Sequence, residues 1–144
     1  MNIILNPGQT NTKLGDISLV ASGNLTGLEN CLVKIINTAG VAYFALPTGI
    51  TDQAFYVLAS GDISGNIVAA EAPGLGDQCR VILDGTCNPG DQLALSTSSL
   101  GTYGHLIKPA AGYGSGYYTF IAEQAGTAGQ RVLVRRIPDR SFSL

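Results

Sequence analysis

Glycine and proline interrupt this chain so often that a long helix has nowhere to form. The 144 residues include 19 glycines and 6 prolines, and one or the other breaks most windows before three helical turns are complete. Glycine inside a helix costs about 1 kcal/mol relative to alanine, and proline costs more. Between the breaks lie short, β-branched apolar runs, which are typical of strands joined by turns. The sequence therefore predicts an all-β protein.

The expected strands are short and evenly punctuated. They cover residues 17–21, 31–36, 41–46, 55–58, 67–70, 80–83, 93–95, 117–122 and 132–137. Residues 37–40 predict the turn of a hairpin, and Asn88-Pro89-Gly90-Asp91 places proline and glycine where a type II turn requires them. We expect residues 96–116 to be weakly structured and Pro138 to end the last strand. Turns at this frequency indicate a small barrel or sandwich.

The length suits a single domain with a segment on each side. Residues 1–13 are expected to form an N-terminal arm, residues 14–138 the β domain and residues 139–144 a C-terminal tail. In the arm, Ile3, Ile4 and Leu5 make an apolar patch before a polar stretch. Two interpretations stay open: a frayed terminus, or an arm that docks on a neighbouring subunit.

Charged residues are scarce and unevenly placed. They make up 12% of the chain, about half of the ~25% in a typical soluble domain. Charged residues are depleted at the centres of protein interfaces, so the composition favours a protein that is covered by other protein. A net charge of −2 argues against a general nucleic-acid binder. Residues 131–144 nevertheless hold four arginines against one aspartate, which suits docking on an acidic neighbour or on another copy.

Targeting and redox signals are weak. No apolar run approaches the ~20 residues that cross a bilayer, and residues 3–5 are too short for the apolar core of a signal peptide. We therefore expect that the protein is made in the cytoplasm and does not associate with a membrane. Cys31, Cys79 and Cys87 are odd in number and loosely spaced, unlike a secreted disulfide framework. Burial as small core side chains is favoured, with a Cys79–Cys87 disulfide in an oxidising medium left open.

No residue pattern points to catalysis. His105 is the single histidine and hence the one possible base of a Ser-His-Asp system, but no Gly-x-Ser-x-Gly elbow accompanies it. The cysteines lack zinc-site spacing. The carboxylates are scattered, several beside glycine, as in turns. We expect no enzyme activity, no metal and no cofactor.

A tyrosine-rich segment predicts a contact surface instead. Residues 113–118 read Tyr-Gly-Ser-Gly-Tyr-Tyr, and tyrosine, serine and glycine dominate the adaptable loops of protein binders. The alternative is a plain loop that ends with Tyr118 on a strand.

The order of strands and turns resembles a known family. The segments that carry the resemblance are 55–58 (FYVL), 76–81 (GDQCRV), 88–93 (NPGDQL), 121–126 (IAEQAG) and 132–134 (VLV). In this arrangement they are similar to the small capsid decoration, or cement, proteins of tailed bacteriophages, over roughly residues 28–137. The N-terminal arm, the tyrosine-rich loop and the arginine-rich end depart from that pattern.

The resemblance implies a β-barrel or β-tulip-like domain, usually trimeric, on the outside of a phage head. There it would bridge copies of the major capsid protein and stabilise their lattice, with no reaction involved. We expect the interface to include Ile3, Ile4, Leu5, Tyr113, Tyr117, Arg135, Arg136, Arg140 and Phe142. The alternative is a carbohydrate-binding or adhesion module of a phage fibre or baseplate, with Tyr103, Tyr113, Tyr117 and Tyr118 stacking on sugars.

Overall fold

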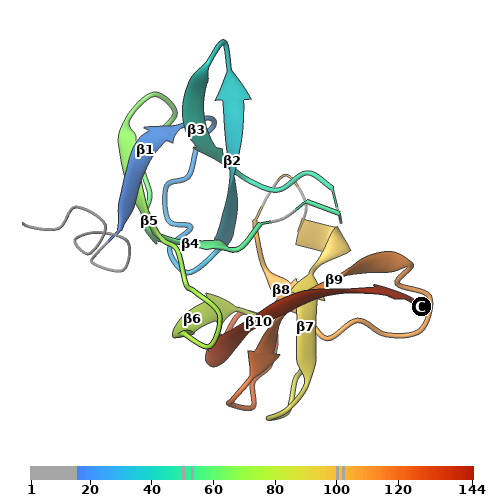
Figure 1. Cartoon of the computed structure of the whole chain (residues 1–144). Coiled ribbons are helices and arrows are strands. Elements are labelled where there is room, and N and C mark those ends of the chain that lie inside the picture. The colour runs from blue at the N-terminus through green and yellow to red at the C-terminus, as the bar shows by residue number, and fades with distance from the viewer. Residues whose placement is uncertain (1–15, 50, 53, 100, 102) are drawn as a thin grey trace, which may run out of the picture.

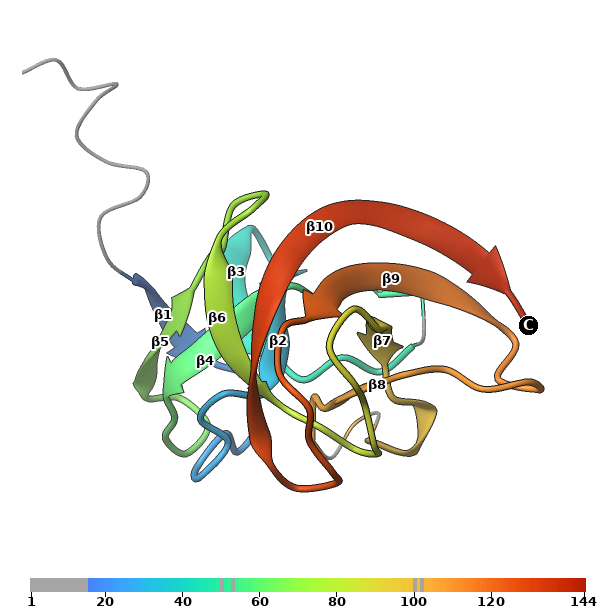
Figure 2. The same cartoon turned by 90° about the horizontal axis from the view of Figure 1, so that it is seen from below.

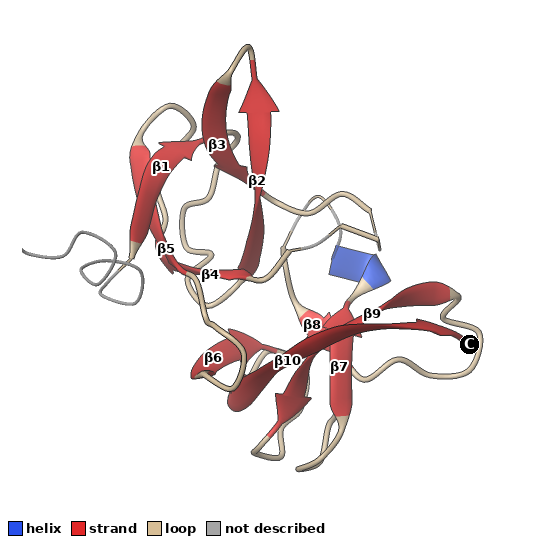
Figure 3. Ribbon diagram, viewed as in Figure 1, coloured by secondary structure: helices blue, strands red, loops and turns tan. Residues whose placement is uncertain are grey.

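The prediction of an all-β protein is confirmed, and the strands form two sheets (Figures 1 and 3). The structure is a computed structural model that describes residues 16–144 except 50, 53, 100 and 102. The first sheet is a closed barrel in the order β1 (Ile17–Ala21), β3 (Val41–Ala45), β2 (Leu32–Thr38), β4 (Tyr56–Ser60) and β5 (Ile67–Glu71). The second has the order β6 (Gln78–Ile82), β10 (Arg131–Ser143), β9 (Ser115–Ala122), β7 (Gln92–Leu95) and β8 (Leu106–Ile107). One 3₁₀ turn, η2 (Thr97–Ser99), follows β7.

The barrel closes because β1 pairs with two strands at once. It runs antiparallel to β5 and parallel to β3. Alternate side chains point inward, since successive residues of a strand face opposite sides. Phe44, Leu58 and Val68 are among the residues that fill the inside. The predicted hairpin joins β2 and β3, and Ala39 and Gly40 at its tip both have positive φ, as a type I′ turn requires.

The second sheet curls around a core of its own. A β-bridge between Leu83 and Leu106 connects the residue after β6 to β8, so the two edges of the sheet approach each other. Phe120, Leu93 and Val81 are fully buried within this curl. Short turns hold its strands, as at residues 88–91, where Gly90 has a φ of 92° and the Asp91 carboxylate accepts the N–H of Asn88 at 2.8 Å.

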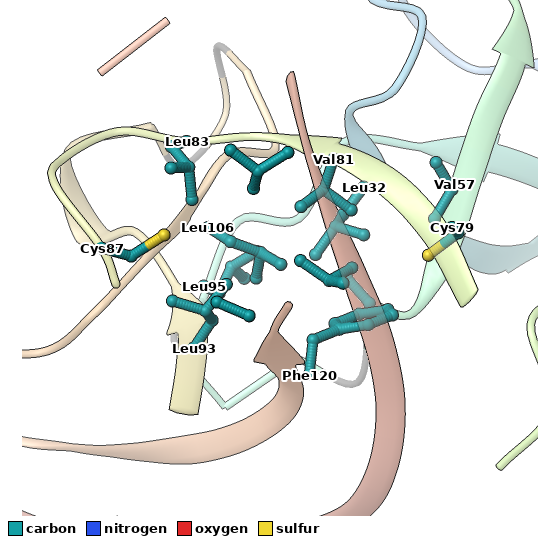
Figure 4. Packing of buried hydrophobic residues seen from close by; sticks show 14 residues of the cluster. Leu32, Val57, Cys79, Val81, Leu83, Cys87, Leu93, Leu95, Leu106 and Phe120 are labelled. Atoms are coloured by element: carbon teal, nitrogen blue, oxygen red, sulfur yellow. The ribbon is translucent and has the colours of Figure 1, made fainter. Parts of the chain in front are cut away.

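Two outward-facing side chains of the barrel complete this second core (Figure 4). Leu32 of β2 and Val57 of β4 lie opposite each other in the ladder. Their neighbours Val33 and Leu58 point into the barrel, so Leu32 and Val57 point out of it. Both are buried among the residues of the second sheet, with exposed fractions of 0% and 2%. The barrel is therefore held to the sheet by shared apolar packing.

Two expectations about the late chain are wrong. Pro138 does not end the last strand, because β10 continues to Ser143 and includes all but the last of the residues expected as a tail. The register shifts between Arg136 and Arg140; Pro138 lies within this irregularity, where the ladder needs no N–H from it. Residues 96–116 are also more ordered than expected, since they contain η2, β8 and the start of β9.

Gly104 is where the connection to β8 passes closest to the barrel. Its carbonyl accepts the N–H of Leu32 at 2.8 Å, and a Cβ at this position would lie 2.1 Å from the backbone oxygen of Leu32. We predict that Gly104→Ala lowers the free energy of unfolding by about 1–3 kcal/mol, the usual cost of overpacking. Gly49→Ala is the control, because its Cβ would meet nothing closer than an Asp52 oxygen at 3.6 Å. Urea unfolding of both variants measures this, and equal losses would contradict it.

Candidate functional site

A cluster of predicted interface residues lies where β9 begins and β10 ends. We call residues 113–118 and 140–144 the C-terminal ribbon. Arg140 pairs with Tyr118 and Phe142 with Gly116, and Gly114 and Leu144 exchange both backbone hydrogen bonds, at 2.8 and 3.2 Å. In both views the ribbon arches away from β1 and β5 and carries the chain's end with it (Figures 1 and 2). The ladder therefore keeps this part of the chain in a defined shape.

One face of the ribbon gathers three aromatic rings and a cation. The rings of Tyr118 and Phe142 stack with centroids 4.3 Å apart, and Tyr113 lies 5.5 Å from Phe142. The Arg140 guanidinium lies 5.3 Å from the centre of the Tyr118 ring, a cation–π distance. Gly116 leaves room for them, since a Cβ there would come within 3.0 Å of the Phe142 ring.

Tyr113 anchors the ribbon to the body of the second sheet. Its hydroxyl donates a hydrogen bond to the carbonyl of Leu95, at the end of β7. Burial raises the pKa of Tyr113 above its ordinary value, so the phenol keeps the proton that it donates. The hydrogen bond thus holds the Tyr113 ring in place beside Phe142.

The structure brings together some of the predicted interface residues and separates others. Tyr113, Arg140 and Phe142 share the aromatic face, whereas Tyr117 pairs with Ser141 and points to the opposite face. Tyr118, which belongs to the tyrosine-rich segment but was not among the expected interface residues, is central to the cluster. Adjacent residues of a strand point to opposite faces, so their positions in the sequence already indicate that Tyr117 and Tyr118 lie on different faces. Ile3, Ile4 and Leu5 lie outside the described residues.

Arg136 is not a surface residue, which corrects the sequence prediction. It is 7% exposed and lies 4.8 Å from the centre of the Phe55 ring and 5.7 Å from that of Phe120. Its guanidinium donates to the carbonyls of Thr119, at 3.1 Å, and Ile137, and pairs with Asp139 at 2.8 Å. Val132 and Val134 are both buried. Because residues two apart in a strand share a face, this alternation would have placed Arg136 inward as well.

Arg135 is half-exposed but already engaged. It forms an ion pair with Glu123 at 2.8 Å and donates to the carbonyl of Gly76 at 2.7 Å. The hydrogen bonds from Arg135 and then Gln78 lower the pKa of Glu123. Of the three arginines expected at the interface, Arg140 therefore remains the most available.

The region around His105 was the one place where the sequence allowed a catalytic base. Ser96 and Ser98 both donate to the carboxylate of Asp84. Burial raises the pKa of Asp84, but these two hydrogen bonds outweigh it and the net pKa is lowered. His105 stacks on Tyr103 at 5.1 Å, and burial lowers its pKa although Asp84 acts in the opposite direction. Ser96 is 1% exposed, so its hydroxyl is closed to a substrate.

The cysteines and carboxylates form no other reactive group in the part of the chain that the structure describes. Cys31, Cys79 and Cys87 are buried and free, and burial raises the pKa of Cys31 to about 11 and that of Cys79 to about 12. Within the described ranges no three His, Cys, Asp or Glu side chains lie together as metal ligands would. None of the helices described there has the length and apolarity of a membrane span.

Comparison with known proteins finds similarity at the level of structure. No protein family model matches the chain, and no curated protein does either. A solved structure that is similar is the N base of the head fiber gp8.5 of bacteriophage phi29, with a TM-score of 0.63. The match covers 84% of this chain and 92% of that chain at 15% sequence identity. At this identity the likeness concerns the fold: the two chains share a β architecture over most of their length.

Two adjacent arginines allow a direct test of their different roles. We predict that Arg136→Ala lowers the free energy of unfolding by about 2–4 kcal/mol, because it leaves Asp139 and two carbonyls without their buried partner. Arg135→Ala, which removes an exposed ion pair, should cost less than about 1 kcal/mol. Chemical denaturation of the two variants measures the difference, and a smaller loss for Arg136→Ala would refute the buried role.

The lowered pKa of His105 predicts a loss of stability in mild acid. Below its ordinary pKa of about 6.5 the unfolded chain binds a proton more readily than the folded one, so stability falls as the pH drops. We expect the melting temperature of the wild type to fall further than that of His105→Gln between about pH 7.5 and about pH 5. The effect of Asp84 sets in only at lower pH, through its lowered pKa. Parallel melting curves for both proteins would contradict this.

Proposed function

We propose that this chain is a structural protein of a tailed-bacteriophage virion. It binds the outer surface of the head, contacts the major capsid protein and stabilises its lattice, as a homotrimer at local symmetry axes, and it catalyses no reaction. The observation that carries the proposal is the fold shared with the base of a phage head fiber over 84% of this chain and 92% of that chain. The scarcity of charged residues supports it, since 12% is low for a surface that faces only water.

The aromatic face of the C-terminal ribbon is the proposed contact with the head. Aromatic residues and arginine are enriched at protein interfaces, where lysine, glutamate and aspartate are depleted. Tyr113, Tyr118 and Phe142 are already packed on one another, so little side-chain entropy is lost when a partner covers them. Arg140 offers an exposed cation beside these rings, which suits an acidic patch on the capsid protein.

Stabilisation of the shell follows from binding alone. A protein that binds the assembled lattice and not its separated subunits shifts the equilibrium toward the lattice by mass action. A trimer that bridges several capsid subunits adds avidity, because each further contact is intramolecular once the first is made.

Heads of the encoding phage that are assembled without this chain provide the test. We predict that the purified protein pellets with such heads, and that Arg140→Glu weakens this binding about tenfold or more, as expected for loss of an interfacial charge pair. Arg131→Glu makes the same change in charge at the exposed beginning of β10 and should bind nearly as the wild type does. Binding should also weaken with added salt.

Two outcomes would count against the proposal. If the wild-type protein fails to pellet with the heads, a role on the head is wrong. If Arg140→Glu and Arg131→Glu bind alike, the head contacts another surface.

A sugar-binding module is the second candidate, and the ring cluster is the observation in its favour. Tyr118 and Phe142 could stack against a sugar, but the four tyrosines first expected to do so do not gather. Tyr117 faces away from Tyr118, and Tyr103 stacks on His105. A glycan array is the discriminating measurement: glycan binding that Phe142→Ala abolishes, together with no binding to heads, would replace the head-binding proposal.

A further inference from the structure

A belt of apolar side chains runs around the outside of the barrel. Val20 of β1 lies opposite Ile67 of β5 on one side and opposite Tyr43 of β3 on the other, and Tyr43 lies opposite Ile36 of β2. Residues opposite one another in a ladder share a face. The inward neighbours Val68 and Phe44 fill the barrel, so these four side chains point outward. With Val41, one pleat further along β3, they form what we call the outer belt.

Among the residues that the structure describes, one outward row of the barrel is covered by the second sheet and this one is not. Leu32 and Val57 also point outward, and the second sheet buries them completely. In the outer belt Ile67 is 70% exposed and Val41 51%, while Val20, Tyr43 and Ile36 are half-buried. The outward residues beside them include Ser18, Thr38 and Ala69, and the belt itself carries no charge. The charged outward residues of the same strands, Lys34 and Glu71, lie at its margins.

We infer that the outer belt is the contact between copies of this chain. The belt extends over four of the five barrel strands, so its two ends face different directions around a closed barrel. A ring of copies needs such an arrangement, because in a heterologous contact each copy presents one patch to the preceding copy and another to the next. The first patch is Ile67 with Val20, and the second is Ile36 with Val41 and Tyr43.

The charges at the two ends of the belt favour this head-to-tail contact. Asp16 and Glu71 lie at the β1–β5 end, where burial, followed by repulsion from Asp16 and Asp77, raises the pKa of Glu71. Lys34 lies at the β2 end, 2.7 Å from Asp52. Because Asp52 already pairs with Lys34, the β2 end carries no net charge. Joining unlike ends brings the carboxylates to this neutral pair, whereas joining two β1–β5 ends would bring like charges together. The belt between them lets copies of net charge −2 meet without burying a charge.

This inference deepens the proposed trimer but does not depend on binding to a phage head. Sedimentation equilibrium of the purified chain should show a mass above that of the monomer. Ile67→Lys and Val41→Lys, one at each end of the belt, should each raise the dissociation constant about tenfold or more, as expected for a charge placed in an apolar contact. Leu75→Lys is the matched control, because Leu75 is 65% exposed but lies in the loop between β5 and β6.

Mixing the two belt variants tests the head-to-tail geometry. The Ile67→Lys protein keeps an intact second patch and the Val41→Lys protein an intact first patch. The mixture should therefore form dimers that cannot close into a ring, while each variant alone stays monomeric. Hydroxyl-radical footprinting of the wild type gives a measurement without mutation: labelling of Tyr43 should rise on dilution, and that of Tyr103, which is 50% exposed, should not.

Several results would overturn the inference. These are a monomeric wild type at every concentration, belt variants that keep the wild-type mass, loss of assembly in Leu75→Lys, or labelling of Tyr43 that does not change on dilution. Failure of head binding with an intact oligomer would count against the proposed function and leave the belt contact standing. A monomeric chain that still binds heads would count against the belt contact and the proposed trimer, and would leave the proposed binding to the head standing.

Discussion

The structure depends on the apolar contact that joins its two sheets. Leu32 and Val57 face out of the barrel and are buried in the core of the second sheet. The barrel has an interior core of its own, but the core of the second sheet is incomplete without these two side chains, since this sheet packs on the outside of the barrel. Arg136 strengthens the same junction: its guanidinium lies over Phe55, just before β4, and Phe120 of β9, and it satisfies carbonyls that would otherwise be buried without a donor.

This junction also determines which surfaces of the two sheets stay exposed. One side of the barrel is used to hold the second sheet, which leaves the outer belt on β5, β1, β3 and β2. The same packing supports β9 and β10, whose far ends project as the C-terminal ribbon. The two surfaces differ in chemistry: the belt is uncharged and consists of aliphatic side chains and one tyrosine, whereas the ribbon carries stacked aromatic rings beside Arg140. Such a division suits a protein that contacts its own copies through one surface and a different partner through the other.

Much of the fold followed from local signals in the sequence. The β2–β3 hairpin and the turn at residues 88–91 were predicted because glycine marks positions of positive φ, and those positions do not depend on distant parts of the chain. The end of β10 was not predicted. Pro138 ordinarily ends a strand, but here the register shift between Arg136 and Arg140 removes the need for its N–H. That shift is a property of the pairing with β9, which no window of sequence around Pro138 contains.

The candidate site likewise combines features that local sequence predicts with features that depend on the tertiary structure. By itself the sequence determined that the chain is built of short strands, that tyrosine and glycine gather near residue 113, and that arginines gather at the end, because all three are properties of local composition. Alternation along a strand could have separated Tyr117 from Tyr118 and placed Arg136 beside Val134, but only the tertiary structure decided which faces are covered. It packed Arg136 against Phe55 and Phe120 and left Ile67 and Val41 exposed. The physical reason is that exposure is set by what packs against a side chain. In this protein those neighbours come from strands far apart in the sequence, as when Leu32 is buried among residues of β6, β7 and β9.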